Sequence, residues 1–301
     1  MSIGMSDTEG TFPDWMGDTD IAFPGLGIYL ENVPKTFEIF GVTIAWYGVL
    51  IGIGMLLAFV LISHVAKKQK MNPDDFYDVG LYILIFGILG ARLYYVIFSW
   101  DYYKDNLSSI FNIRQGGLAI YGGLIAGFAT MIIYCIRKKK NMFAMMDVGV
   151  LGVLVGQILG RWGNFMNREA FGDYSDGLFA MRLPVAAVRS GEITDAMRAH
   201  MAEGVNYIQV HPTFLYESMY NLALLILIYF LQGKKRFEGE VALWYIGGYG
   251  IGRFFIEGLR TDQLLLPGTH LPVSQMLGII LFAAALITDI IIRKKQKPAT
   301  K

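Results

Sequence analysis

Seven long apolar segments constrain the fold of this chain more than any other feature. They occupy residues 42–63, 79–98, 117–136, 148–166, 213–232, 241–257 and 273–292. Each is close to the roughly 20 residues that an α-helix needs to cross the hydrocarbon core of a bilayer. The composition agrees, because 54% of the 301 residues are hydrophobic and 17% are charged, against about a quarter in ordinary soluble domains. We therefore expect an all-α polytopic membrane protein with seven transmembrane helices.

Basic residues cluster after the odd-numbered apolar segments. The clusters lie at residues 67–70, 137–140, 234–236 and 293–297. Because short cytoplasmic loops carry an excess of lysine and arginine, we expect the N-terminus outside and the C-terminus inside. The net charge of +1 gives no general attraction to a polyanion, so no nucleic-acid partner is expected.

The longest loop on the expected outer side spans residues 167–212 and has mixed polarity. We expect it to form a small extracytoplasmic head, inserted into a single membrane domain that covers residues 1–301. No internal repeat is evident, so the sequence does not support an inverted-repeat transporter. The single cysteine, Cys135, excludes an internal disulfide and a cysteine-built metal cluster.

Polar side chains interrupt the apolar segments at a similar depth. A helix rises about 1.5 Å per residue, so early residues of odd segments and late residues of even segments lie near the expected outer surface. They are Tyr47, Arg92, Tyr121, Arg161, Asn164, Asn167, Tyr216, Glu217, Arg253 and Glu257. A charged residue at the centre of a span costs about 2.5–3.5 kcal/mol, so charges gathered at one depth indicate function. Arg92 equally fits an interfacial arginine, because Tyr94 and Tyr95 beside it resemble an aromatic belt.

The spacing of the charged residues predicts two polar helix faces. Arg253, Glu257 and Arg260 follow the pattern i, i+4, i+7, and Arg161 and Asn164 the pattern i, i+3, so each set lies on one face. Guanidinium groups donate paired hydrogen bonds to phosphate oxygens. The anion most available at this depth is a phospholipid head group. We therefore expect a lipid-phosphate site in the outer half of the bilayer, with no metal.

One continuous motif carries a family resemblance. Residues 160–172 read Gly-Arg-Trp-Gly-Asn-Phe-Met-Asn-Arg-Glu-Ala-Phe-Gly. This resembles the signature of the bacterial prolipoprotein diacylglyceryl transferase family, in which Gly-Arg, Gly-Asn-Phe, a second Asn, a Glu and a closing Gly are fixed. The resemblance extends along nearly the whole chain, through Trp46-Tyr47-Gly48, His211-Pro212-Thr213, Leu215-Tyr216-Glu217, Tyr249-Gly250 and residues 253–260. One position departs from it, because Tyr121 stands where the family often has a histidine considered catalytically important.

The resemblance implies a reaction, two substrates and a location. The family transfers the diacylglyceryl group of phosphatidylglycerol to the thiol of the lipobox cysteine in a preprolipoprotein signal peptide. A thioether forms and glycerol phosphate is released, as the first step of lipoprotein maturation. No cofactor is expected. The expected location is the bacterial plasma membrane, with the active site toward the outer leaflet.

The resemblance also assigns roles to residues. The expected catalytic residues are Arg161, Arg253, Tyr121, Glu169 and Glu257, and the expected substrate-binding residues are Tyr47, Asn164, Asn167, Gly172, His211, Tyr249 and Arg260. Arg161 and Arg253 would hold the phosphate, and Glu257 would orient Arg253 or Arg260. The group that accepts the thiol proton stays open among Tyr121, Glu169, Glu257 and His211.

Three other classes of protein compete with this interpretation. A transporter or flippase for an anionic lipid could use the same arginines, but the expected cytoplasmic halves of the spans carry almost no polar residues beyond Asp147 and Asp289. An intramembrane protease would need a serine–histidine dyad or paired aspartates at one depth. A structural scaffold leaves three arginines at one level unexplained.

Overall fold

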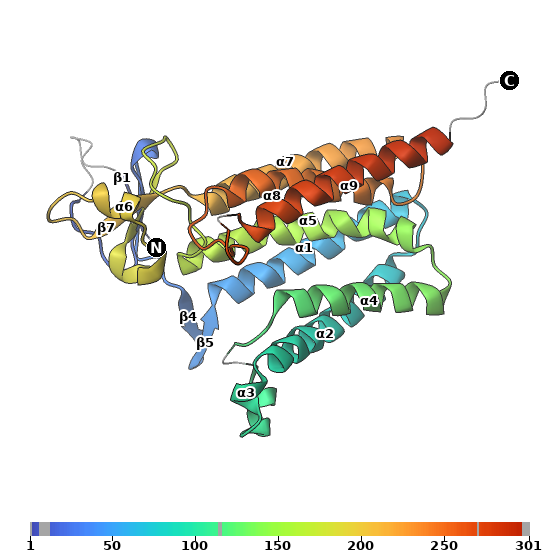
Figure 1. Cartoon of the computed structure of the whole chain (residues 1–301), viewed down its shortest axis with the longest axis horizontal. Helices are drawn as coiled ribbons and strands as arrows, with labels where there is room; N and C mark the ends of the chain where they lie inside the picture. The colour runs from blue at the N-terminus through green and yellow to red at the C-terminus, as the bar shows by residue number, and fades with distance from the viewer. Residues whose placement is uncertain (1, 6–12, 114–115, 270, 297–301) are drawn as a thin grey trace. The chain divides into compact units, whose positions relative to one another are not determined.

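The computed structural model describes residues 2–5, 13–113, 116–269 and 271–296, so Lys297 of the C-terminal basic cluster lies outside the described residues. Each expected apolar segment contains one long helix (Figure 1). These helices are α1 (Trp46–Lys68), α2 (Pro73–Phe98), α4 (Ile120–Lys138), α5 (Met142–Asn167), α7 (Thr213–Leu231), α8 (Glu240–Glu257) and α9 (Val273–Lys295). Two short helices, α3 (Trp100–Tyr103) and α6 (Asp195–Ala199), lie in the connecting segments.

Six helices in the described part of the chain are long and apolar enough to cross a membrane. They are α1, α2, α4, α5, α9 and α7 with the helical turn that extends it to Lys234. Helix α8 is not among them, because its 18 residues include three charged side chains, those of Glu240, Arg253 and Glu257. The chain is therefore a mostly helical, multi-pass membrane protein.

Two helices, α2 and α4, begin at residues other than those expected, and in α2 the reason is a first turn of polar residues. Helix α2 starts at Pro73 rather than near residue 79, and the Asn72 side chain caps it by accepting a hydrogen bond from the Asp74 amide at 3.1 Å. Such a cap satisfies an amide that has no partner within the helix. Helix α4 begins later than expected, at Ile120, because Gly116 and Gly117 have φ angles of +87° and +78° that a helix does not allow.

The expectation of an all-α chain is wrong in two places, and in the first of them five short strands form an antiparallel sheet in the order β1-β3-β2-β6-β7. The strands are β1 (Ser2–Met5), β2 (Ile21–Phe23), β3 (Ile28–Glu31), β6 (Met181–Pro184) and β7 (Tyr207–Val210). A separate hairpin joins β4 (Thr36–Ile39) to β5 (Val42–Ala45). The loop 167–212 is thus ordered, and it shares its sheet with the N-terminal residues.

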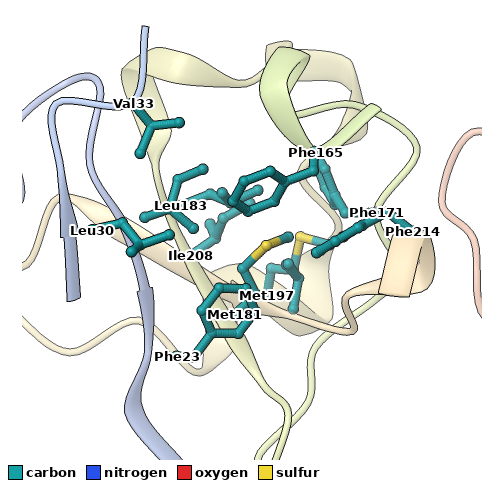
Figure 2. Packing of buried hydrophobic residues seen from close by; sticks show 12 residues of the cluster. Phe23, Leu30, Val33, Phe165, Phe171, Met181, Leu183, Met197, Ile208 and Phe214 are labelled. Atoms are coloured by element: carbon teal, nitrogen blue, oxygen red, sulfur yellow. The ribbon is translucent and has the colours of Figure 1, made fainter. Parts of the chain in front are cut away.

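A hydrophobic cluster anchors this sheet to the ends of two helices (Figure 2). Leu183 and Ile208 of the sheet are fully buried in the cluster, and Phe165 of α5 and Phe214 of α7 are buried beside them. The rings of these two phenylalanines are 4.7 Å apart. Burying such a side chain contributes about 1.5–3 kcal/mol. The cluster therefore fixes the end of α5 beside the beginning of α7.

The chain divides into two compact units. The first unit comprises residues 1–58 and 151–301, and the second comprises residues 59–150. Within the second unit, α2 and α4 approach closely through glycines, since a Cβ at Gly90 or at Gly122 would clash with the other helix. Small residues commonly allow such close packing in membranes.

Candidate active site

The end of α5 carries the first part of the site, in the first unit. One helical turn separates Arg161 from Asn164, and Arg161 Nη1 donates a hydrogen bond to Asn164 Oδ1 at 3.2 Å. The amide nitrogen of Asn164 then donates to Glu169 Oε1 at 3.0 Å, and Asn167 donates to the same oxygen at 3.3 Å. Asn164 therefore links a guanidinium group to a carboxylate.

Arg168 holds the turn that brings Glu169 back toward Asn164. Its φ angle is +56°, and its side chain is buried at 3% exposure. The guanidinium Nη2 donates to the carbonyls of Thr19 at 2.5 Å and Val33 at 2.6 Å. Arg168 thus ties the signature segment to the N-terminal region and has a structural role.

Glu217 joins the two arginines that the sequence analysis assigned to the phosphate. It lies near the start of α7 and is 2% exposed. Its Oε1 lies 2.8 Å from Arg161 Nη2, and its Oε2 lies 3.2 Å from Arg253 Nη1. The polar faces of α5 and α8 therefore meet, as predicted, but they do so through a carboxylate to which we had given no role. The sequence could have pointed to Glu217, because it is an acidic residue at the same expected depth as the arginines.

The end of α8 continues the ion-pair network. Glu257, one turn after Arg253, forms an ion pair with it and is 2% exposed. Arg260 Nε lies 4.0 Å from Glu257 Oε2, and Arg260 donates two hydrogen bonds to Asp262 at 2.8 and 2.7 Å. Burial opposes ionisation of Asp262, but the bonds from Arg260 outweigh it and lower the pKa of that carboxyl. Sequence reasoning had not singled out Asp262.

Two tyrosines border the network within the first unit. Tyr249 lies one turn before Arg253 on α8 and interacts with Arg161, Arg253 and Glu217. The ring of Tyr47, at the start of α1, lies directly over Gly163, where a Cβ would be 2.5 Å from the ring. A side chain at position 163 would thus displace the tyrosine, which explains the glycine between Arg161 and Asn164.

Gly172 and His211 form a close backbone junction. The Gly172 amide donates to the His211 carbonyl at 2.9 Å, and a Cβ at Gly172 would lie 2.7 Å from the Leu259 carbonyl oxygen. The His211 Nδ1 lies 3.4 Å from the Tyr216 hydroxyl. Burial lowers the pKa of His211, and the carboxylates of Asp173 and Asp176 oppose that shift. The structure therefore gives Gly172 a packing role.

Two of the polar side chains expected near the outer surface, those of Arg92 and Tyr121, lie in the second unit. Tyr121 is in the first turn of α4, with 47% exposure. Arg92 is 7% exposed and donates hydrogen bonds to backbone carbonyls of Ser109, Ile110, Asn112, Gly116 and Gly117. The Arg92 side chain therefore neither extends to the membrane interface nor has a nitrogen left for a phosphate, because Nε, Nη1 and Nη2 all donate to backbone carbonyls before α4.

Charge is balanced along the network. Arg161, Arg253 and Arg260 face Glu217, Glu257 and Asp262. Among the residues that the structure describes, no group of three or more histidine, cysteine, aspartate or glutamate side chains could hold a metal ion. Arg161 and Arg253 can therefore bind an anion when the carboxylate of Glu217, which they share, moves away from them.

Comparison with known proteins assigns the chain to a family. A family profile described as prolipoprotein diacylglyceryl transferase matches residues 34–291. The chain belongs to the prolipoprotein diacylglyceryl transferase family. The resemblance drawn from the signature at residues 160–172 is thereby confirmed, and the family is one of transferases.

Curated relatives of this family cover nearly the same length. Phosphatidylglycerol–prolipoprotein diacylglyceryl transferase of Finegoldia magna is 40% identical over 260 residues, which are 86% of this chain and 95% of the relative. The proteins of the same name from Clostridioides difficile and Bacillus mycoides are 39% identical over 261 residues and 41% identical over 258 residues. These matches cover 87% and 85% of this chain, and 96% and 90% of the two relatives.

Proposed function

We propose that this chain transfers the diacylglyceryl group of phosphatidylglycerol to the lipobox cysteine thiol of a preprolipoprotein, as the first step of lipoprotein maturation. Family membership and the names of the relatives support this activity. The structural observation that carries it is the convergence of Arg161 and Arg253, from two helices, on the single carboxylate of Glu217. Two guanidinium groups at one point match the charge and geometry of a lipid phosphate.

The proposal includes seven membrane spans, with α8 as the seventh. At about 1.5 Å per residue, its 18 residues extend about 27 Å, close to the thickness of the hydrocarbon core. Its charged side chains are paired inside the protein: Glu240 with Arg293, Arg253 with Glu217 and Glu257 with Arg253. Paired charges that face other helices are those a membrane tolerates best.

The orientation follows from the basic helix ends. Lysine and arginine occupy the last turns of α1, α4 and α9, which are cytoplasmic if the positive-inside rule applies. The arginine site, the head containing residues 167–212 and the N-terminus are then external, and the C-terminus is internal. In the bacterial plasma membrane this places the site toward the outer leaflet, where a translocated signal peptide meets phosphatidylglycerol.

In the proposed reaction, the two arginines stabilise negative charge on both the leaving group and the nucleophile. The substrate thiolate attacks the glyceryl carbon that carries the phosphate ester, so a carbon–sulfur bond forms and the carbon–oxygen bond breaks. The oxygen leaves with the bonding electron pair as glycerol phosphate, and its growing negative charge is stabilised by Arg161 and Arg253. The same positive charge favours thiolate over thiol, whose ordinary pKa is about 8.5.

Glu169 fits the role of proton acceptor best among the described residues of the first unit. Its side chain is 28% exposed, and it lines a polar cavity of about 440 Å³ together with Lys35, Asn167 and Arg189. A proton taken up there has a route to water. The hydrogen bonds from Asn164 and Asn167 fix the carboxylate beside the arginine site.

The other candidate residues are proposed to orient the reacting groups or to contact the substrates. Asn164 and Asn167 hold Glu169, and Glu257 orients Arg253 and, more distantly, Arg260. Tyr47, Tyr121 and Tyr249 are proposed to contact the lipid, and His211 to contact the peptide at the membrane surface.

The decisive experiment is mass spectrometry of a lipobox peptide incubated with the purified protein in vesicles containing phosphatidylglycerol. The wild-type chain should add one diacylglyceryl group to the peptide cysteine, and Arg161→Ala and Arg253→Ala should not. Arg198→Ala, at an exposed position of α6, is the matched control and should stay active. Near-normal transfer by either site variant would contradict the assignment. Lipid flux without a peptide product would instead support the transporter.

A further inference from the structure

A second cavity lies between α7, α8 and α9, near the ends of these helices that carry basic residues. Its volume is about 570 Å³, and Leu227, Leu231, Trp244, Phe282 and Leu286 are among the side chains that line it. The three helices run alongside one another within the first unit (Figure 1). The cavity is therefore an apolar recess within a helix bundle, of the size at which small ligands bind.

The mouth of the cavity is basic. Lys234, Arg236 and Arg293 line it. Arg293 forms ion pairs with Glu240 at 2.6 Å and with Asp289, an acidic residue that also lines the cavity, at 3.0 Å. Lys234 and Arg236 are exposed, and no ion pair of either side chain is recorded among the described residues. Two cations thus stand at the entrance of an apolar recess.

This cavity is distinct from the arginine site. Along α8, Gly248 is the lining residue nearest the site, and it precedes Arg253 by five residues, which is about 8 Å at the rise of an α-helix. Along α7, the nearest lining residue, Leu224, follows Glu217 by seven residues, or about 11 Å. A ligand in the cavity would therefore contact the other ends of these helices.

We propose that this cavity binds an anionic phospholipid, with an acyl chain among the apolar side chains and the phosphate at Lys234 and Arg236. The combination of an apolar recess with two cations at its mouth is complementary to such a lipid. A partner helix fits poorly, because a helix about 10–12 Å wide with a pitch of about 5.4 Å occupies roughly 400–600 Å³ per turn, so the cavity would admit about one turn. The lipid is drawn from the leaflet at the basic helix ends, the cytoplasmic one in the proposed orientation, and it binds whether or not transfer occurs.

The test uses the full chain in phosphatidylcholine vesicles that contain a small fraction of photoactivatable phosphatidylglycerol. Photoactivatable phosphatidylcholine with the same acyl chains is the matched probe. After irradiation, labelled peptides are mapped to the cavity segments 224–231, 243–248 and 282–286. Two cations near the surface should favour the anionic probe there by roughly 30-fold. Lys234→Gln/Arg236→Gln should bring that ratio close to one, whereas Lys138→Gln/Lys139→Gln, at exposed positions at the end of α4, should leave it unchanged.

A second pair of variants tests the apolar part of the cavity. Leu227→Trp places a larger ring in the recess and should reduce labelling, whereas Leu222→Trp, on α7 but outside the cavity lining, should not. Equal labelling by the two probes, or a preference that survives the Lys234→Gln/Arg236→Gln change, would overturn the proposal. So would cross-links at these segments between two copies of the chain. Peptide lipidation by the same samples reports separately on the proposed transfer activity.

Discussion

The carboxylate of Glu217 offers the sharpest test of how the arginine site is built. Glu217→Gln removes the charge but keeps the volume of a side chain that is 2% exposed and forms ion pairs with Arg161 and Arg253. Removing one partner of a buried ion pair costs about 3–5 kcal/mol. The guanidinium-bearing side chains keep 21% and 16% exposure, and their bonds to Asn164 and Glu257 remain. We therefore expect a loss of stability of about 3 kcal/mol, at the lower end of that range.

Glu217→Gln should also reduce activity, by a route separate from its effect on folding. Without the shared carboxylate, Arg161 and Arg253 repel each other, and a displacement of about 1 Å in a catalytic site can cost about 100-fold in rate. Because the carboxylate no longer competes for the guanidinium groups, KM for phosphatidylglycerol should not rise. The loss should therefore appear in kcat.

The assay is initial-rate diacylglyceryl transfer to a lipobox peptide at varied phosphatidylglycerol, with thermal unfolding measured on the same preparations. Glu217→Asp keeps the charge but is too short to reach both arginines, so it should recover stability more than kcat. Glu203→Gln, an exposed carboxylate in the head, should match the wild type. A Glu217→Gln protein with normal kcat, or one whose only defect is a raised KM, would refute a positioning role for this carboxylate.

Three further predictions concern the surroundings of the site. Burial lowers the pKa of His211 in the folded protein, so protonation of this histidine favours the unfolded state. Stability should therefore fall as pH drops below about 6.5. The His211→Asn variant should show a weaker pH dependence of thermal unfolding between pH 5 and pH 8. Arg168→Met removes the donors to the Thr19 and Val33 carbonyls and should cost about 1–3 kcal/mol for each orphaned group, measured by denaturant unfolding. Arg92→Met should leave the carbonyls of Ser109, Ile110, Asn112, Gly116 and Gly117 without the guanidinium donor and speed limited proteolysis at these residues.

Exposed positions supply matched controls for these variants. They are His200→Asn, Arg198→Met and Arg137→Met. An unaltered pH dependence in His211→Asn would show that another group causes it. Wild-type stability of Arg168→Met, or wild-type cleavage of Arg92→Met, would show that water replaces the lost guanidinium bonds at little cost.

The positions of the long helices could be read from the sequence because hydropathy is a local property. Each of the seven apolar segments contains one helix, and the errors are at the ends, where Asn72 caps a polar first turn and Gly117 delays α4. The strands of the sheet were missed because they have only three or four residues. Such strands show no usable period of two, and they are stable only in a sheet that brings the N-terminal residues to the loop 167–212.

The sequence by itself determined which charges share a helix face and a depth, because helix rise and periodicity fix both. It therefore indicated that the faces of Arg161 and Arg253 could meet. Only the tertiary structure decided that Glu217 lies between them and that the donors of Arg92 are used by backbone carbonyls. The partner of a charged group depends on which helices pack together and on their rotation, and these are set by contacts between residues far apart in the chain.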